Sequence, residues 1–357
     1  MPNHASPPQP FASGPPGSIV VAQLAFIGDM VFTTPLLDAL IDRWPSAEIV
    51  VVGRDAALEV LAADPRVAAR IAYDKSGADR GVRGHARVAD AVRARRPALF
   101  LGVSRSARTS LLARRSGAAV RVGFAGPAQG LAYHHVVPRG DASRNFPARP
   151  LALLEPLVGP VAPRPLRLVV DESHRREAAE RLAGAGWRRE RLLAVAPGAH
   201  YATKRWPVER FAALLALARL RGGFRPALYG GPAEAPLLDA LRAACPDALD
   251  RRAAGIGGLV AELTHAAAFV GNDSGPTHVA RALGVPAIAL HGPTDPDALR
   301  DGNPYHALAL GLPCQPCSPS GDPQCPLGHH ACLRALPEEA VWAELERVAA
   351  VSPARRP

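Results

Sequence analysis

The strongest constraint on the fold is a repeated alternation of short β-branched runs with helical patterns. In the first half, strand-like runs occupy residues 18–24, 48–53, 67–73, 98–103 and 119–123. After residue 170 the alternation restarts, with strand-like runs at residues 192–196, 226–229, 267–270 and 286–290. Strands joined by helices form right-handed crossovers, so they build a parallel sheet with helices on both faces. The sequence therefore predicts an α/β fold with two doubly wound, Rossmann-like domains.

Proline positions indicate how the 357 residues divide. Residues 1–17 form a Pro-rich segment that we expect to be a flexible leader, and five prolines between residues 148 and 170 indicate a connector. We expect an N-terminal domain over 18–163, a C-terminal domain over 164–336, and a C-terminal helix and tail over 337–357. Ligands of open α/β sheets bind beyond the carboxyl ends of the strands, so we expect the site there, in a cleft between the domains.

The basic excess has two interpretations. There are 42 Lys and Arg residues against 32 Asp and Glu, and only Lys75 and Lys204 are lysines. The excess is either a generic arginine-rich surface or a basic face toward phosphorylated or anionic partners. No apolar run reaches the roughly 18 residues of a membrane-spanning helix, and the start lacks the pattern of a secretory signal. We expect a cytoplasmic protein without a nucleic-acid partner.

A carboxylate follows the first predicted strand. Asp29 stands in Ile27-Gly28-Asp29, where a glycine turn leads into a helix, but the spacing is not that of a dinucleotide-binding loop. Asp29 either complements the dipole at the helix N-terminus or acts as a general base.

Two loops of the second half have the composition of anion-binding turns. The loop at 197–207 carries Lys204 and Arg205 just before a helix, where a phosphate is the natural occupant. The loop at 270–278 contains Asp273, Ser274 and Gly275 before another helix. Its backbone amides, that of Thr277 included, are expected to point toward a pyrophosphate, and Asp273 is expected to accept from sugar hydroxyls. For each loop the alternative is a solvated or capped turn without a ligand.

Four segments in this order resemble glycosyltransferase family 9, the ADP-heptose:lipopolysaccharide heptosyltransferases. They are IGDMVFTTPLLDAL, PGAHYATKRWPVERF, LYGGPAE and FVGNDSGPTHVARALGVPAIALHGPTDP. The resemblance spans residues 19–345 and implies the GT-B fold, with the donor held by the C-terminal domain and the acceptor by the N-terminal one. It implies inverting transfer that needs no cofactor and no divalent metal.

The resemblance also implies roles for individual residues. Asp29 matches the proposed base, and Lys204 matches the lysine that contacts the phosphate and the donor sugar. The residues assigned to donor binding are His200, Arg205, Glu234, Asp273, Ser274, Gly275, Thr277 and His278. The sequence departs from the family at Gln23, often Arg, and at His291, often Phe.

The resemblance also implies an acceptor that carries carboxylates and phosphates and faces the loop after the strand at 98–103. Arg105 and Arg108 follow a strand of the N-terminal half, and guanidinium groups suit carboxylates and phosphates. The alternative is that both are ordinary surface arginines without a ligand. The partners implied are ADP-heptose and a lipopolysaccharide core or lipid A precursor at the inner face of the inner membrane. Transfer from another nucleotide-sugar, transfer to a protein, and a non-catalytic sugar-binding module are the alternatives.

Four cysteines cluster in a Pro- and Gly-rich loop at 314–332. Cys314, Cys317, Cys325 and Cys332 have a spacing compatible with a structural zinc or iron site. The alternative is four reduced thiols in a surface loop, since disulfides are rare in the cytoplasm. No carboxylate completes an open site, so a catalytic metal is not expected.

Overall fold

A computed structural model describes residues 11, 14–126, 129–138, 146–301 and 305–351 of the chain. The chain forms two compact units, Met1–Leu166 and Arg167–Pro357. Most of the expected leader, residues 1–10, 12 and 13, lies outside the described residues, as does the end of the tail, 352–357.

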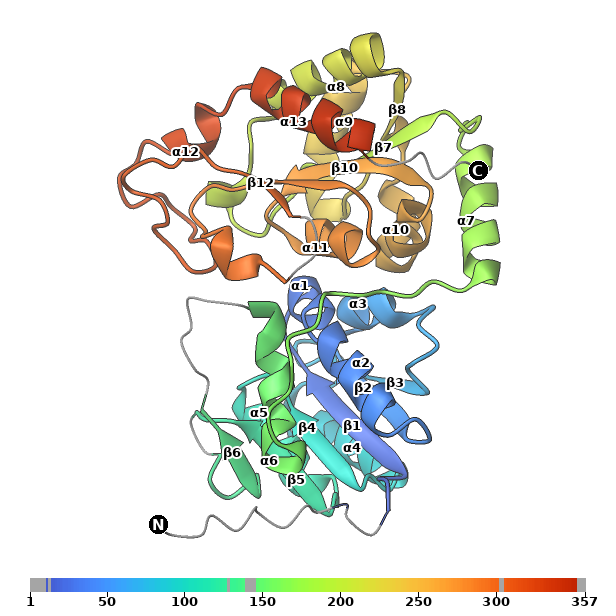
Figure 1. Ribbon diagram of the computed structural model, residues 1–357, viewed down its shortest axis with the longest axis vertical. Helices are drawn as coiled ribbons and strands as arrows, with labels where there is room; N and C mark the ends of the chain where they lie inside the picture. Colours follow the sequence, from blue (N-terminus) through green and yellow to red (C-terminus); the bar gives the residue numbers. More distant parts are fainter. Residues whose placement is uncertain (1–10, 12–13, 127–128, 139–145, 302–304, 352–357) are drawn as a thin grey trace. The chain divides into compact units, whose positions relative to one another are not determined.

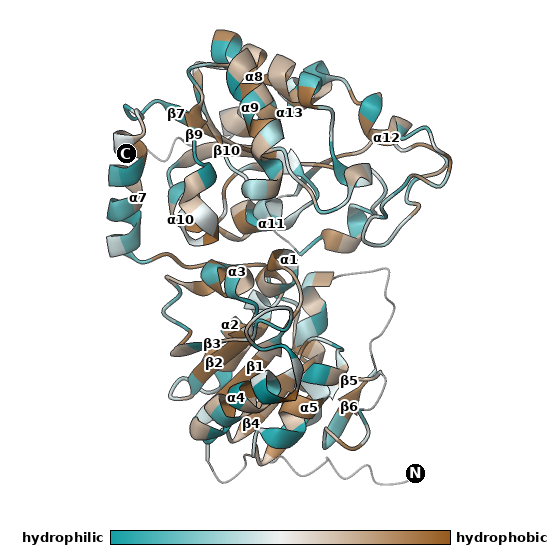
Figure 2. Cartoon of the chain, turned by 180° about the vertical axis from the view of Figure 1, so that it is seen from behind, coloured by the Kyte–Doolittle hydropathy of each residue, from teal (hydrophilic) through white to brown (hydrophobic). Residues whose placement is uncertain are grey.

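The first unit is built on a six-stranded parallel sheet in the order β3-β2-β1-β4-β5-β6 (Figure 1). Its strands are β1 (Ser18–Gln23), β2 (Glu48–Gly53), β3 (Ala69–Ala72), β4 (Leu99–Gly102), β5 (Val120–Phe124) and β6 (His135–Val137). In the register, Val20 pairs with Val50 on one side and with Phe100 on the other. Rows of β-branched and aromatic side chains therefore cross the sheet, whose central strands are the hydrophobic bands of Figure 2.

Helices surround this sheet. They are α1 (Ile27–Val31), α2 (Thr34–Arg43), α3 (Asp55–Leu58), η1 (Glu59–Leu61), α4 (Gly81–Ala94), α5 (Ala107–Arg115), η2 (Phe146–Leu153) and α6 (Glu155–Val158). On one face, Val88 and Val92 of α4 and Leu112 of α5 share a buried core with Val20 and Phe100 of the strands. Helices α4 and α5 thus hold the loops that follow β3 and β4.

The second unit repeats the topology, with the strand order β12-β11-β10-β7-β8-β9. Its strands are β7 (Arg191–Ala196), β8 (Phe224–Leu228), β9 (Leu249–Asp250), β10 (Ala266–Asn272), β11 (Ala287–Leu290) and β12 (His306–Leu308). All the neighbouring strands run parallel. Numbered within its own unit, each sheet reads 3-2-1-4-5-6, the order of Rossmann-like domains.

The helices of the second unit complete the Rossmann-like layers. They are α7 (Glu172–Gly184), η3 (Ala202–Lys204), α8 (Val208–Gly222), η4 (Pro232–Glu234), α9 (Ala235–Ala244), η5 (Arg252–Ala254), α10 (Gly255–Leu263), α11 (Gly275–Ala282), η6 (Asp297–Leu299), α12 (Ala331–Arg334) and α13 (Glu338–Val351). Trp342 and Leu345 of α13 pack with Phe211 of α8 and Leu193 of β7 in one buried core. The C-terminal helix is therefore part of this unit's core.

The predicted fold class, two doubly wound α/β domains, is confirmed. Each sheet has its topological switch point where the first and fourth strands of the unit meet, between β1 and β4 and between β7 and β10. Loops at such points bind ligands in open α/β sheets. Among the helices of the described residues, none is both apolar and long enough to cross a lipid bilayer.

Candidate active site

The switch point of the second unit joins the two predicted anion-binding loops. Asn272, the last residue of β10, donates from Nδ2 to the carbonyl oxygen of Pro197 after β7, at 2.7 Å. Its Oδ1 accepts from the amide of Trp206 at 2.9 Å. Asn272 is fully buried, so these bonds satisfy its amide and tie the 197–207 loop to the end of β10.

A buried ion pair lies between these loops. The ammonium Nζ of Lys204 lies 2.7 Å from Oδ2 of Asp273, and the two side chains are only 13% and 5% exposed. The same Oδ2 accepts from the hydroxyl of Thr294 at 2.7 Å, and Nε2 of His278 lies 3.4 Å from Oδ1. Each oxygen of the carboxylate therefore has a donor.

The hydrogen bonds around Asp273 fix the protons on a neighbouring histidine. Thr294 gives its one hydroxyl proton to the carboxylate, so its oxygen must accept from Nδ1 of His291, 3.1 Å away. Burial lowers the pKa of His291, so its ring is neutral at physiological pH and Nε2 is an acceptor. That nitrogen accepts a hydrogen bond from the hydroxyl of Tyr305. The chain of donors thus runs from Tyr305 through His291 and Thr294 to Asp273.

The charge of Asp273 is stabilised by these neighbours. Burial alone would raise its pKa. At the acidic pH where the carboxyl titrates, the charge of His291, the hydrogen bond from His278 and the charge of Lys204 hold its pKa well below its usual range. Burial lowers the pKa of His278, although Asp273 acts in the opposite direction. The site at neutral pH therefore contains an ionised carboxylate, an ammonium and two neutral imidazoles.

The structure adds to one sequence expectation and corrects another. The carboxylate of Asp273 is 5% exposed, pairs with Lys204 and accepts from Thr294, and its contact with a sugar hydroxyl stays a prediction. The amide of Thr277 donates to the carbonyl of Ser274 at 3.1 Å, and its hydroxyl donates to the carbonyl of Asn272. Thr277 therefore braces the turn, since its amide does not point outward.

Ser274 and Gly275 form the N-terminus of α11, next to the ion pair. Ser274 is the N-cap in extended conformation, yet its side chain makes no capping hydrogen bond. Its Oγ is buried and has no hydrogen-bond partner. A helix N-terminus favours an anion, and a buried orphan hydroxyl indicates a polar ligand group at this point.

The other predicted residues of this unit surround the same two loops. Arg205 donates from Nε to the carbonyl of Ala199 at 2.9 Å, and the ring of His200 lies edge-on to Tyr201. Oε2 of Glu234 accepts from the amide of Gly231 at 2.9 Å. A Cβ on Gly198 would lie 2.5 Å from Cγ of Glu234. Only glycine therefore allows the loop after β8 to approach the loop after β7 this closely. All three residues are thus placed at the switch point.

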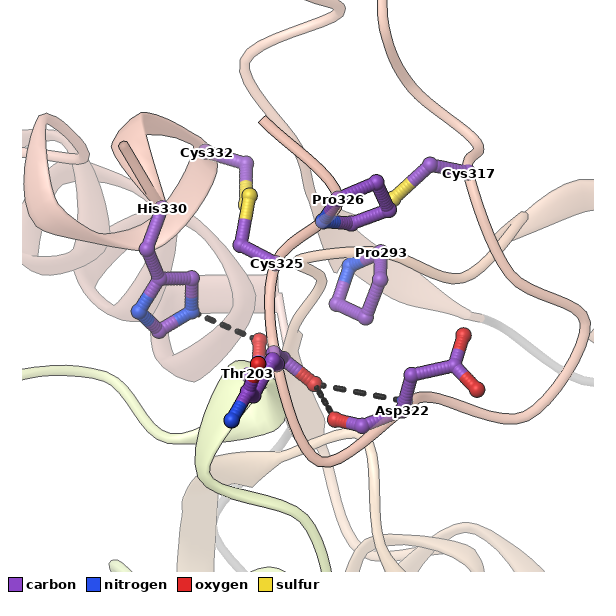
Figure 3. A pocket seen from close by; sticks show the side chains of 9 residues that line it. Thr203, Pro293, Cys317, Asp322, Cys325, Pro326, His330 and Cys332 are labelled. Carbon is purple, nitrogen blue, oxygen red and sulfur yellow. Dashed lines mark hydrogen bonds between the residues drawn. The ribbon is translucent and has the colours of Figure 1, made fainter. Parts of the chain in front are cut away.

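The cysteine-rich loop braces the segment that carries Lys204 (Figure 3). The hydroxyl of Thr203 donates to the carbonyl of Asp322, and Nε2 of His330 donates to the carbonyl of Thr203 at 2.7 Å. Gly321 packs on the stem of Lys204, where a Cβ would lie 2.6 Å from Cδ. The loop therefore determines the position of the lysine from two sides.

The four thiols of this loop lie within electrostatic reach of one another. Cys317, Cys325 and Cys332 line one pocket. Burial, together with Cys325 and Cys314, raises the pKa of Cys317, while amide hydrogen bonds, from His330 first, lower that of Cys325. Within the described part of the chain, no three His, Cys, Asp or Glu side chains are arranged to hold an ion. The metal site stays a prediction.

In the first unit, Asp29 lies at the switch point between β1 and β4. It is the third residue of α1, half-buried, and its Oδ2 accepts from the amide of Phe26 at 3.1 Å. The hydroxyl of Thr33 and the side-chain Nε2 of Gln23 both donate to the carbonyl of Asp29, at 2.8 and 3.4 Å. Asp29 thus lies in the first turn of α1, where it complements the helix dipole, and the role of general base stays a prediction.

Arginine and lysine side chains gather at the same edge of the first sheet. Arg105 and Arg108 are exposed, and Arg105 donates to the carbonyl of Ala125. Lys75, after β3, donates to the carbonyl of Leu24 at 3.3 Å. Burial lowers the pKa of Lys75, and the nearby Arg54 and Arg108 lower it further. These cations make the edge suitable for an anionic ligand.

Sequence reasoning missed several of these residues. Lys75 is one of only two lysines and follows a predicted strand, which is the signal that identified Lys204. His291 was recognised only as a departure from the family. Thr294 lies in the family segment HGPTDP but was given no role of its own, and Tyr305 carried no sequence signal, because only the fold brings them to Asp273.

Most of the chain matches a known protein family. Residues 86–330 match the model of glycosyltransferase family 9 (heptosyltransferase). A lipooligosaccharide heptosyltransferase 2 of Haemophilus influenzae is 33% identical over 112 residues, 29% of this chain and 32% of that protein. The chain thus spans about a third of that curated relative. A lipopolysaccharide heptosyltransferase 3 of Escherichia coli is 26% identical over 76% of this chain and 82% of its own length.

Solved structures share the fold over nearly the whole chain. A family 9 glycosyltransferase of Veillonella parvula has a TM-score of 0.79 and 25% identity, covering 94% of this chain and 98% of its own. The Escherichia coli ADP-heptose lipopolysaccharide heptosyltransferase II has a TM-score of 0.76 and 21% identity, covering 93% and 98%.

Proposed function

This chain belongs to glycosyltransferase family 9, and we propose that it transfers a heptosyl group from ADP-heptose to a sugar of a lipopolysaccharide core. One observation carries the proposal: the Lys204–Asp273 ion pair lies beside the buried, unpartnered hydroxyl of Ser274 at the start of α11. That combination suits a diphosphate, because the ammonium, the hydroxyl and the helix N-terminus all favour negative charge.

The donor binds at the switch point of the second unit. Its diphosphate lies against Lys204, Ser274 and the amide of Gly275, and Arg205 and His200 flank it. Glu234 accepts hydrogen bonds from the ribose. Asp273 does not leave the ion pair, since its role is to hold the ammonium where the phosphates arrive.

The reaction is a single displacement with inversion. The oxygen of an acceptor hydroxyl forms a bond to the anomeric carbon while the bond from that carbon to the phosphate oxygen breaks. The hydroxyl proton passes to the carboxylate of Asp29, and ADP leaves with the electron pair. Negative charge grows on the leaving diphosphate, where Lys204 and the α11 N-terminus stabilise it without a metal ion. The Gln23 and Thr33 bonds to the turn keep Asp29 in place.

The acceptor is an anionic core carried by lipid A. Arg105 and Arg108 bind its carboxylates and phosphates, and Lys75 and Arg54 add to the same cluster of cations. Because the acceptor is anchored in lipid, the enzyme works peripherally at the cytoplasmic face of the inner membrane.

Turnover with purified sugars tests the function. We expect ADP release that depends on both ADP-heptose and a heptose-deficient core, and a core product whose mass increases by one heptose. UDP- and GDP-sugars serve as controls. Turnover with one of these instead, or onto a protein acceptor, would replace the heptose assignment, and binding without turnover would make the protein a sugar-binding module.

We further propose that the cysteine-rich loop holds a structural metal. The residue types fit, since four thiols lie within electrostatic reach of one another, but the described side chains are not arranged around an ion. A bound ion would cross-link the loop. The hydrogen bonds of Asp322 and His330 to Thr203 would then hold the neighbouring Lys204 more firmly in place.

Metal analysis of untagged protein tests this second proposal. We expect one zinc or iron per chain, lost in Cys317→Ser and retained in the control Cys245→Ala, whose cysteine is buried in the core of the same unit. Equal metal content in both variants would contradict the site.

A further inference from the structure

One half of the first sheet is free of acidic residues. Between Asp90 and Asp141 the sequence contains nine arginines and no Asp or Glu, whereas 32 acidic residues spread evenly over 357 would place four or five there. This stretch forms the end of α4, and then β4, α5, β5 and β6 (Figure 1). One side of the unit therefore carries a concentrated positive charge.

Three described arginines of this half, Arg93, Arg114 and Arg121, donate to backbone carbonyls rather than to carboxylates. Arg114 donates to the carbonyl of Leu131 at 3.4 Å, Arg121 donates to that of Ala132 at 2.8 Å, and Arg93 donates to that of Arg115. These acceptors are neutral, and in the described residues no ion pair involves Arg93, Arg114 or Arg121. The described ion pairs on either side along the chain, Arg87–Asp79 and Arg164–Asp42, lie outside the stretch.

Exposed leucines lie among these charges. Leu131 is 82% exposed and Leu111 is 42% exposed. Arg108, Leu111 and Arg114 follow one another at intervals of three on α5, so they share one helix face. The bond from Arg114 to the carbonyl of Leu131 places that leucine beside the same face. We call Leu111, Arg114, Arg121 and Leu131 the α5 surface.

We propose that the α5 surface docks onto an anionic phospholipid bilayer. Transfer of leucine side chains into the boundary between headgroups and acyl chains is favourable, while guanidinium groups remain at the level of the lipid phosphates. A nucleic acid would engage the arginines but leave Leu131 in water, so the combination favours a membrane. The proposal deepens the peripheral location given above and rests on it, but lipid binding does not depend on which sugar is transferred.

Sedimentation of the full-length protein with vesicles tests the docking. We expect binding to phosphatidylcholine vesicles that contain phosphatidylglycerol, little binding to pure phosphatidylcholine, and weakening by added salt. Leu131→Ser should weaken binding about tenfold. Arg114→Gln should weaken it roughly fivefold. Neither side chain belongs to the proposed catalytic machinery, and unchanged melting temperatures show that the variants fold.

A matched control lies on the second unit. Leu220 of α8 is 81% exposed, as much as Leu131, but its neighbour Arg219 is paired with Asp247 at 3.3 Å. Leu220→Ser should leave vesicle binding unchanged. Equal losses in the two leucine variants, or no loss in Leu131→Ser, would overturn the proposal. Binding of single-stranded DNA that is sensitive to Arg114→Gln but not to Leu131→Ser would assign the surface to nucleic acid instead. Docking without any sugar transfer would refute the proposed function alone.

Discussion

Replacing Thr294 with valine tests the chain of hydrogen bonds that supports the Lys204–Asp273 pair. Valine has nearly the same shape but removes the donor to Asp273 and the acceptor of His291. A hydrogen bond to a charged group contributes about 1.5–3 kcal/mol, and a buried N–H left without an acceptor costs about 1–3 kcal/mol. Because Thr294 is 4% exposed, bulk water does not substitute for the hydroxyl. The free energy of unfolding should therefore fall by about 3–5 kcal/mol.

For a unit of this size, that loss corresponds to a decrease in melting temperature of roughly 10 °C. Tryptophan fluorescence suits the measurement, because Trp187, Trp206 and Trp342 lie in the second unit and only Trp44 lies in the first. Thr264→Val is the control, since the buried Thr264 hydroxyl makes one neutral bond to the carbonyl of Ala261 and its loss should cost about 1 kcal/mol. Thr294→Ser should restore most of the stability.

The pH dependence gives a second check. The pKa of Asp273 is lowered in the folded protein, so its contribution to stability is present above the pKa of an unfolded carboxyl and is lost as the pH falls toward the folded value. The difference between the wild type and Thr294→Val should be constant at neutral pH and narrow below about pH 4. A valine variant no less stable than the Thr264→Val control would refute the reasoning.

Three further variants test the proposed chemistry. Asp29→Asn should keep the Kd for ADP-heptose in calorimetry but lower kcat at least about 100-fold, and near-wild-type turnover would remove the base role. Lys204→Met should raise the donor Kd roughly 10- to 100-fold, measured by the same titration. An unchanged Kd would show that the ammonium does not contact the diphosphate. Ser274→Ala should leave the melting temperature of the free protein unchanged, because its hydroxyl has no partner, yet weaken donor binding about fivefold. A lower melting temperature with unchanged affinity would make Ser274 purely structural.

The alternation of strands and helices was sufficient to predict two Rossmann-like domains, because strands buried on both faces must be continuous apolar runs. Of the four edge strands, β3 was predicted, at residues 67–73, whereas β6, β9 and β12 were not. Segments β9 and β12 have only two and three residues, and their pattern is too short to distinguish from a loop. They are strands because β8 and β11 offer free edges in the right register.

The sequence also predicted that Lys204 and Asp273 lie on anion-binding loops that follow strands, and the carboxyl ends of these strands meet at one sheet edge. It did not predict that Asp273 is buried and pairs with Lys204, because burial is a property of the packed molecule. The expected contact of Asp273 with a sugar stays a prediction.

What the amino-acid order determined by itself was local: glycine and proline turns, helix starts, and the strand pattern that sets the topology. Only the tertiary structure decided which groups are joined by hydrogen bonds, as along Tyr305, His291, Thr294 and Asp273. Hydrogen bonds depend on ångström distances between side chains from separate loops, and no periodicity along the chain encodes those distances.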